Sequence, residues 1–455
     1  MNERSSQAWV IAGIFLLALA LLLAIALVRS PFRQLPDSLF VSDGFGYYIY
    51  LPSIVIDGDL DLANQIAHHP GAQGHWTFAQ SPVTGKVGNI FQIGPAILWA
   101  PFFLCAHFLL SALNVLGFEV SRSGFGWGYE LPVYCGSFVY GMIGVWYMWK
   151  LLHRLWGNGI ANSVSFYLIL GTPIAAYLWF EPDMAHILSM TLIAMLFYYL
   201  HDLGLHQGPV SFRSWMLLGF LTGLIALVRV PDLLVGLVIV GIGVISKLWS
   251  GQKINSFVMK QTMKGMLVFG VVAAVTFTPQ LVIWEFFYGS YFSMPPNPFY
   301  TKIHWMAPDI LNYLFSTKHG LFSWTPLLFI ATIGLLWGGV KSYPLIRYAL
   351  LLLFVSVYFN SVIHHWWMGS SFGERRMVDY GVIFALGLGY LFHRRESLLR
   401  QPWFHFIGLS LCAFNWILIL RYFTHDLPEY GAVSWSNLYV ETVIYPLNIL
   451  LRIFS

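Results

Sequence analysis

The chain has 455 residues, of which 58% are hydrophobic and only 10% are charged. Because soluble domains carry about a quarter charged residues, this chain lacks the polar side chains needed to cover a water-exposed surface, and a soluble enzyme is excluded. The formal net charge of +4 is mild, and the basic residues lie mainly between apolar segments. They indicate membrane orientation and no nucleic-acid partner.

Apolar segments of about 20 residues recur along the whole chain, and this length crosses a bilayer core. In lipid each backbone polar group needs a partner within the protein, so these segments are predicted to be helices. The expected fold is an all-α polytopic membrane protein, one domain over residues 1–455, with about 12 transmembrane helices. The expected spans are residues 8–29, 131–150, 160–179, 184–203, 214–230, 232–249, 265–287, 320–339, 344–361, 377–392, 402–422 and 438–454.

The first apolar segment, Val10 to Val28, is interpreted as a retained span. It is longer than the apolar core of a signal peptide, and Arg29-Ser30-Pro31 is a poor cleavage site. The N-terminus is then placed on the cytoplasmic side.

The segment Ile90 to Leu116 is also long enough to cross, but the charge pattern argues against it. If it does not cross, most basic residues between spans fall on the cytoplasmic side, as the positive-inside rule requires. If it crosses, every later loop changes side and the bias reverses. Pro95 and Pro101 also disfavour a straight span. We expect a juxtamembrane helix in a first external loop, residues 30–130, with further external loops at 288–319, 362–376 and 423–437.

Asp43 is the first candidate for chemistry, because it follows the first span in Ser42-Asp43-Gly44-Phe45-Gly46-Tyr47. The glycines let a ligand approach the backbone, and Tyr47 is of the type that contacts sugar rings. An interfacial loop with a helix-capping aspartate explains the same residues equally well.

A second acidic site, Glu181-Pro182-Asp183, lies between two predicted spans. An Asp after Pro at the start of a helix is also a common N-terminal arrangement. Under the predicted topology Asp183 and Asp43 lie on the same side of the membrane, which permits a shared site.

The third candidate is the predicted external loop 362–376, which contains His364, His365, Trp366, Trp367, Arg375 and Arg376. Tryptophans suit both a sugar pocket and the membrane interface. Arginines on the external side run against the positive-inside bias, and their guanidinium groups suit phosphate recognition. We therefore interpret Arg375 and Arg376 as functional.

Two further cations lie near the predicted outer face, Arg229 and Lys318. Each could meet a phosphate, but an Arg229–Asp232 structural pair and interface anchoring by Lys318 are equally good interpretations. His68, His69 and His75 do not match the spacing of a standard metal site.

These features, in this order, resemble the bacterial GT-C glycosyltransferases, especially the protein-mannosyltransferase-like and aminoarabinose-transferase-like group. The segments that carry the resemblance are Ser42-Asp43-Gly44 with Tyr47-Tyr48, Gln92-Ile93-Gly94-Pro95 with Pro101, Lys150 with Arg154, Glu181-Pro182-Asp183, and Trp367 with Gly369, Ser371-Phe372-Gly373 and Arg375. The resemblance covers nearly the whole chain. No second carboxylate stands next to Asp43, which leaves the need for a divalent cation, Mg²⁺ or Mn²⁺, open.

The resemblance implies an enzyme that takes a sugar from a polyprenyl phosphate or pyrophosphate. It would transfer that sugar, with inversion, to a lipid, glycan or protein acceptor. The implied location is the external, periplasmic face of the bacterial cytoplasmic (inner) membrane.

The resemblance also implies roles for the candidate residues. Asp43 would be the general base, and Glu181 or Asp183 would position the acceptor or a cation. Arg375, with Arg376, Lys318 or Arg229, would bind the donor phosphate. Tyr47, His364 and Trp366 would shape the sugar pocket.

The competing class is a membrane transporter or lipid flippase. Such proteins often show repeated halves and ionisable residues at the bilayer midplane. In this chain no internal repeat is visible, and the candidate residues gather at the predicted external interface.

Overall fold

The computed structural model describes residues 38–69, 72–203, 210–238, 240–241, 256–293, 295, 302–340, 344–367 and 369–454. Within these ranges the chain is helical, and its extended pairing consists of two isolated β-bridges, Gln80 with Val87 and Ile303 with Ile363. The all-α class is therefore observed. The predicted span 8–29 and part of the predicted span 232–249 lie outside the described residues.

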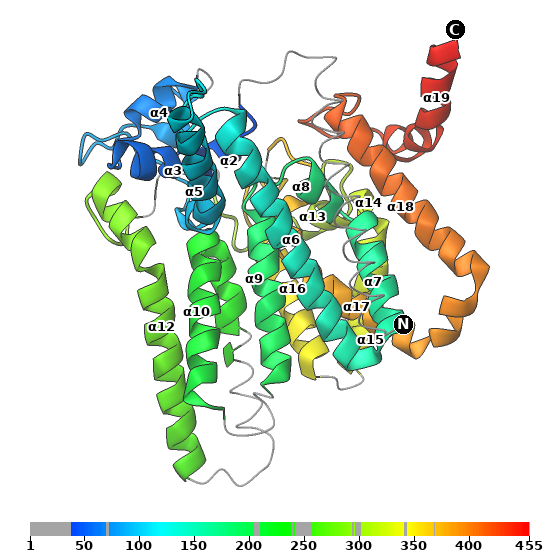
Figure 1. The fold of residues 1–455 in the computed structure, drawn as a ribbon. Coiled ribbons are helices and arrows are strands. Elements are labelled where there is room, and N and C mark those ends of the chain that lie inside the picture. The colour runs from blue at the N-terminus through cyan, green and yellow to red at the C-terminus, as the bar shows by residue number, and fades with distance from the viewer. Residues whose placement is uncertain are drawn as a thin grey trace.

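Residues 38–115 form a layer of helices at one end of the molecule, which we call the cap (Figure 1). The cap helices are α2 (Ser42–Tyr48), α3 (Tyr50–Pro52), η1 (Ser53–Asp57), α4 (Ala63–Ala67), η3 (Trp76–Phe78) and α5 (Gly94–Val115). Aromatic rings fill its interior, with the Phe40 ring stacked on Tyr48 at 4.4 Å and 5.4 Å from Trp99. The Tyr50 hydroxyl donates to the Phe91 carbonyl at 2.9 Å. These contacts hold α2 and α3 against α5 and the segment before it, within the cap.

A bundle of longer helices forms the rest of the molecule (Figure 1). It comprises α6 (Trp127–Trp156), α7 (Asn158–Leu170), α8 (Ile174–Trp179), α9 (His186–Asp202), α10 (Phe212–Val228), η4 (Val230–Asp232), α12 (Ser256–Tyr288), α13 (Ile310–Phe315), α14 (Leu321–Trp324), α15 (Pro326–Val340), α16 (Pro344–Ser361), η6 (Arg375–Met377), α17 (Gly381–Arg394), η7 (Glu396–Arg400), α18 (Pro402–Phe423), η8 (Ser436–Glu441) and α19 (Thr442–Phe454). Seven predicted spans each correspond to one of these helices: 131–150, 184–203, 214–230, 265–287, 344–361, 377–392 and 402–422.

Five helices in the described part of the chain are long and apolar enough to cross a membrane: α5, α6, residues 260–288 of α12, α16 and α18. The shorter helices α10, α15 and α17 are apolar as well. A polytopic all-α membrane protein fits these helices, and the number of about 12 spans stays a prediction.

The neighbours of α5 place it beyond the end of the bundle. Gly94 at its start lies against the Leu227 carbonyl, in the last turn of α10. From there α5 follows the first half of α6, where the Tyr140 hydroxyl donates to the Leu98 carbonyl at 2.8 Å. Figure 1 shows α5 in the cap, above α10. Its length and apolarity would also permit a span, so the juxtamembrane location of α5 stays a prediction.

Gly94 should tolerate no side chain, because a Cβ there would overlap the Leu227 carbonyl and lie 2.6 Å from the Val228 nitrogen. We expect Gly94→Ala to destabilise the protein by about 1–3 kcal/mol, since backbone atoms must shift. Thermal unfolding in detergent measures this as a lower midpoint. Gly159→Ala is the matched control, because no atom lies within 4 Å of a Cβ at Gly159; equal midpoints for the two variants would contradict the close contact.

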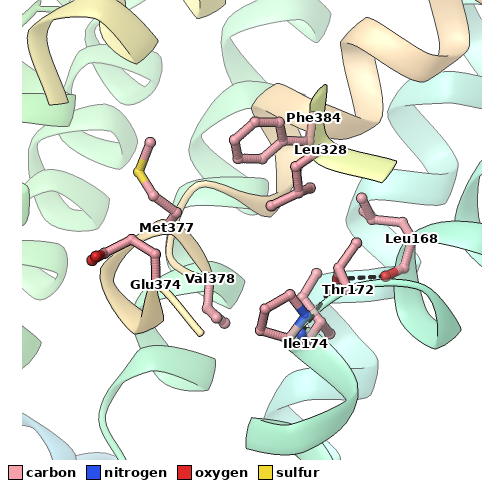
Figure 2. A pocket seen from close by; sticks show the side chains of 10 residues that line it. Leu168, Thr172, Ile174, Leu328, Glu374, Met377, Val378 and Phe384 are labelled. Carbon is pink, nitrogen blue, oxygen red and sulfur yellow. Dashed lines mark hydrogen bonds between the residues drawn. The ribbon is translucent and has the colours of Figure 1, made fainter. Parts of the chain in front are cut away.

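Two predicted spans are interrupted near the cap. The predicted span 160–179 is divided into α7 and α8, and the predicted span 320–339 is divided into α14 and α15. Pro173 and Pro326 follow the breaks, and a proline lacks the N–H that would continue the helix. The breaks meet, because a Cβ on Gly171 would lie 2.8 Å from the Leu327 Cδ2 atom. Beside them is a small, mainly apolar cavity with room for about one water molecule (Figure 2).

The predicted final span, residues 438–454, corresponds to η8 and α19, which leave the bundle, and its crossing of a membrane stays a prediction. Tyr439 stacks on Phe414 of α18 at 5.6 Å, whereas Thr442 contacts Arg421, which lies nearer the C-terminal end of α18. The chain therefore advances in the same direction as α18, and α19 continues past the end of the bundle (Figure 1). The buried Arg421 fixes this course, because it donates to the Asn437 carbonyl and the Thr442 hydroxyl, each at 2.7 Å.

Candidate functional site

Asp43 and Arg375 form an ion pair between the cap and the bundle. Asp43 lies in the first turn of α2, and Arg375 begins η6, just before α17. The Arg375 Nη1 atom is 3.1 Å from the Asp43 Oδ2 atom, and the two side chains are 14% and 28% exposed. Burial lowers the pKa of Arg375, but the Asp43 carboxylate raises it, and the net shift is upward. The pair is therefore charged and accessible to a ligand.

Two more predicted residues, Asp183 and Tyr47, lie next to this pair. Asp183 is buried beside α2, where a Cβ on Gly44 would lie 2.7 Å from the Asp183 Cγ atom. Glycine at position 44 is thus needed for the close approach of Asp183. Tyr47 lies one turn after Asp43, packs on the Phe91 ring at 5.1 Å, and interacts electrostatically with Arg375. Asp183 therefore lies against the same helix, α2, that carries Asp43, and a shared site of the two stays a prediction.

Arg229 belongs to a buried polar network that adjoins the Asp43–Arg375 pair. Its Nε atom lies 3.2 Å from the Asp232 Oδ2 atom and 3.1 Å from the Asp379 Oδ2 atom. Its Nη1 atom lies 3.3 Å from the Nε2 atom of His186, whose Nδ1 atom is 2.8 Å from the Asp379 Oδ1 atom. Arginine can only donate, so His186 accepts at Nε2 and donates its Nδ1–H to Asp379. His186 is therefore neutral.

The network joins three segments of the chain. His186 and Ser189 come from α9, Arg229 follows α10, Asp232 ends η4, and Asp379 with Tyr380 precedes α17. The Ser189 hydroxyl donates to Asp232 at 2.6 Å, and the Tyr380 hydroxyl donates to it at 3.2 Å. Both interpretations of Arg229 thus fit, because it pairs with Asp232 and also lies within electrostatic range of Arg375.

Arg376, adjacent to Arg375, is directed into the protein. It is 4% exposed, donates to the Asn360 side chain at 2.6 Å and to the Trp366 carbonyl, and lies 3.4 Å from the Glu374 carboxylate. These contacts tie the loop 362–376 to α16. Arg376 therefore supports the loop, and of the two arginines the more accessible Arg375 is the better candidate for the predicted phosphate-binding role.

Glu374 lies in the same loop, outside the helices that could span a membrane, and its carboxyl group is buried. In Figure 2 the Glu374 carboxylate points away from the small cavity, on the side opposite Thr172 and Phe384. Burial raises the pKa of Glu374 from 4.5 to about 7, against the opposing effect of Arg376 and Arg375. The carboxyl group is therefore partly protonated near neutral pH.

This raised pKa makes the stability of the fold depend on pH. Between about pH 4.5 and pH 7 the folded protein binds more protons at Glu374 than the unfolded chain does, so this group lowers stability as pH rises through that window. We expect Glu374→Gln to remove this part of the pH dependence. Thermal unfolding at pH 5 and pH 8 tests it, and an unchanged difference between the two midpoints in the variant would contradict the prediction.

Lys318, His364 and Trp366 lie on the loop side of the site. The Lys318 Nζ atom sits 3.2 Å from the centroid of the Trp367 ring, and burial lowers the pKa of Lys318. His364 is exposed, with its ring 5.5 Å from that of His304. Trp366 is buried. The structure connects Lys318 to Arg375 only indirectly, because both interact electrostatically with His319.

Glu181 lies in the turn between α8 and α9, two residues before Asp183. It is partly buried and interacts electrostatically with Tyr177 and Tyr422, and Tyr177 in turn lies near Arg375. Glu181 is therefore at the edge of the site that contains Asp43.

Within the described ranges, no group of three or more His, Cys, Asp or Glu side chains is arranged to hold a metal ion. The early histidines take part in packing. The His69 ring lies 4.5 Å from the Phe45 ring, the His68 ring lies 5.4 Å from the Phe125 ring, and His75 lies 2.8 Å from the Thr77 hydroxyl. The need for a divalent cation stays open.

The sequence did not single out His186 and Asp379 as site residues. Both stand at the ends of apolar helices, where an ionisable group is a functional candidate. That rule could have found them, but their pairing with Arg229 joins positions more than 40 residues apart and follows only from the fold.

No protein-family model matches the chain, and no curated protein matches it. Among solved structures, the chain is similar to the crystal structure of ArnT from Cupriavidus metallidurans in the apo state. The identity is 14% and the TM-score is 0.48, over 97% of this chain and 76% of that chain. At this level of similarity, the residues of the site itself must carry any conclusion about function.

Proposed function

We propose that the chain is an integral membrane glycosyltransferase. It moves a sugar from a polyprenyl phosphate or pyrophosphate donor to an acceptor, with inversion, at the external face of the bacterial cytoplasmic membrane. The observation that carries the proposal is the accessible Asp43–Arg375 pair, 3.1 Å apart, where the cap meets an apolar bundle. This places a proton acceptor beside a cation suited to phosphate.

The pair supplies the two functions that such a transfer needs. The acceptor hydroxyl attacks the anomeric carbon while Asp43 takes its proton. The bond from that carbon to the phosphate oxygen breaks, and negative charge grows on the leaving phosphate. Arg375, with Arg229 behind it, stabilises this charge in a partly buried site. Polyprenyl chains lie along the apolar helices.

The remaining candidates surround this centre. Asp183 and Glu181 position the acceptor or a divalent cation, and Tyr47 borders the sugar. Lys318 serves a phosphate or headgroup that extends beyond Arg375. His364 and Trp366 belong to the loop that closes the pocket on the sugar side, with Trp366 as its buried support.

The proposed external location of the site is tested by labelling. A cysteine at Leu116, which is 73% exposed at the end of α5, should react with a membrane-impermeant thiol reagent added outside intact cells. The exposed Cys105 is first replaced by alanine to remove background labelling. Reaction only after the membrane is opened would place the cap in the cytoplasm and overturn the assignment.

A transporter or lipid flippase is the second candidate, and the paired helix breaks at Gly171 and Thr325 favour it, because broken helices are common in such proteins. The two functions differ in the chemical fate of the donor. Proteoliposomes are loaded with a polyprenyl-phosphate sugar and an acceptor extract, and the lipids are analysed by mass spectrometry. Free polyprenyl phosphate and a glycosylated acceptor support transfer, whereas intact donor that has changed leaflet supports transport.

A further inference from the structure

The network behind Arg229 has more acceptors than the guanidinium Nε can satisfy. Asp232 and Asp379 each place an oxygen within 3.2 Å of that one Nε atom, which carries a single hydrogen. The Asp379 Oδ2 atom is buried and has no hydrogen-bond partner in the described part of the chain. Two ionised carboxylates can only accept, so a proton shared between them would satisfy an acceptor that the guanidinium leaves unpaired.

The surrounding charges favour keeping that proton. Asp232 is 2% exposed and Asp379 is fully buried, so two negative charges side by side would be poorly solvated. His186 brings no charge, since its Nε2 accepts from Arg229. With both carboxylates ionised the cluster would carry a net charge of −1, and with one shared proton it is neutral.

The groups that face the carboxyl pair come from each neighbouring element. They are His186 and Ser189 of α9, Arg229 after α10, Tyr380 before α17, and, at longer electrostatic range, Arg375 and Arg376 of η6 and Asp43 of α2. The arginines are always charged. The carboxyl pair is therefore the group in this cluster that can gain or lose a proton near neutral pH.

We propose that Asp232 and Asp379 share one proton and, with His186, position Arg229 for the donor phosphate, with its positive charge balanced by one carboxylate instead of two. The proposal rests on the proposed function and deepens it by adding three positioning residues. The Arg229 side chain is 13% exposed, whereas those of Asp232 and Asp379 are 3% and 0% exposed. Its guanidinium thus lies at the boundary between the buried acids and the Asp43–Arg375 pair.

The shared proton couples donor binding to pH. A polyprenyl-phosphate sugar is a phosphodiester that carries one negative charge throughout the neutral range. Loss of the proton would add a negative charge beside Arg229 and repel this donor. Affinity should therefore fall as pH rises, by about tenfold or more for one charge at this distance in a partly desolvated site.

The test measures binding of a radiolabelled polyprenyl-phosphate sugar to the purified full chain between pH 6 and pH 9. Wild type should lose affinity about tenfold or more across this range. Asp379→Asn and Asp232→Asn, in which one group cannot ionise, should bind with an affinity that is nearly independent of pH. Asp202→Asn is the control, because it removes a carboxylate that pairs with Arg154 at the far end of α9 and should behave as wild type.

A second measurement does not depend on the donor. The infrared carbonyl band of a protonated carboxylic acid is recorded in a Glu374→Gln background, because Glu374 is itself partly protonated near neutral pH. In this background the band should be present at pH 6, weaken at pH 9, and be absent when Asp232→Asn or Asp379→Asn is added, but not when Asp202→Asn is added. Donor binding that falls equally with pH in wild type and Asp379→Asn, or a band unchanged in both network variants, would overturn the shared proton. Absence of donor binding at every pH, with the infrared band behaving as expected, would instead overturn the proposed function and the role of Arg229 in binding the donor phosphate.

Discussion

Asp43→Asn should lower the rate of sugar transfer by about 10²–10⁴-fold while the donor still binds. The amide has nearly the shape of the carboxylate but cannot take the proton of the acceptor hydroxyl. The variant also removes the charge that faces Arg375 at 3.1 Å, so the affinity for an anionic donor should stay the same or increase. Initial rates and equilibrium donor binding by the purified protein measure the two effects separately.

Asp61→Asn is the matched control for this experiment. Asp61 lies in an exposed turn of the same cap, where its side chain accepts from the Ala63 nitrogen at 3.1 Å, a contact that asparagine can keep. Its activity should equal that of wild type. If Asp43→Asn retained full activity, the base would have to be sought at Asp183 or Glu181, which border the same site.

Arg375→Gln should reduce kcat by about 10²–10³-fold, because the growing charge on the leaving phosphate loses its nearest donor. Arg375→Lys should recover part of the rate, since it restores the charge but not the two-pronged geometry of the guanidinium. Steady-state kinetics with a saturating acceptor measure both variants. If Arg375→Gln and Arg375→Lys lost kcat by the same factor, and that loss matched their loss of stability, Arg375 would have no catalytic role.

The neighbouring Arg376→Gln separates chemistry from folding. Arg376 holds Asn360 and the Trp366 carbonyl, so its loss should lower the unfolding temperature and the amount of folded protein. The folded fraction should keep most of its activity per molecule. If Arg376→Gln lost as much kcat as Arg375→Gln at full stability, the division of roles between the two arginines would be incorrect.

Much of the fold could be predicted from hydrophobicity and charge. Spans such as 344–361 correspond to single helices because their length and composition fix them. The basic loops predict a juxtamembrane position for α5, although its composition alone fits a span, and this position stays a prediction. Hydrophobicity and charge could not predict the course of α19, because it depends on the contact of Arg421 with the backbone at Asn437.

The candidate site could be predicted in outline. Asp43, Asp183 and Arg375 were identifiable because charges are rare in this chain and these stand next to apolar segments. The sequence could not distinguish Arg375 from Arg376, since the short helix η6 turns two identical neighbours in different directions. The network of His186, Arg229 and Asp379 was out of reach for a similar reason: its members meet only after α9, α10 and α17 have packed together.

Sugar transfer by the purified wild-type protein tests the central proposal most directly. The protein is incubated with a panel of radiolabelled polyprenyl-phosphate sugars and a cell-envelope extract that supplies acceptors, and the sugar transferred and the polyprenyl phosphate released are counted together. The account predicts equal amounts of both for at least one donor, and neither product with Asp43→Asn. A wild-type protein that binds these donors and leaves all of them intact would contradict it.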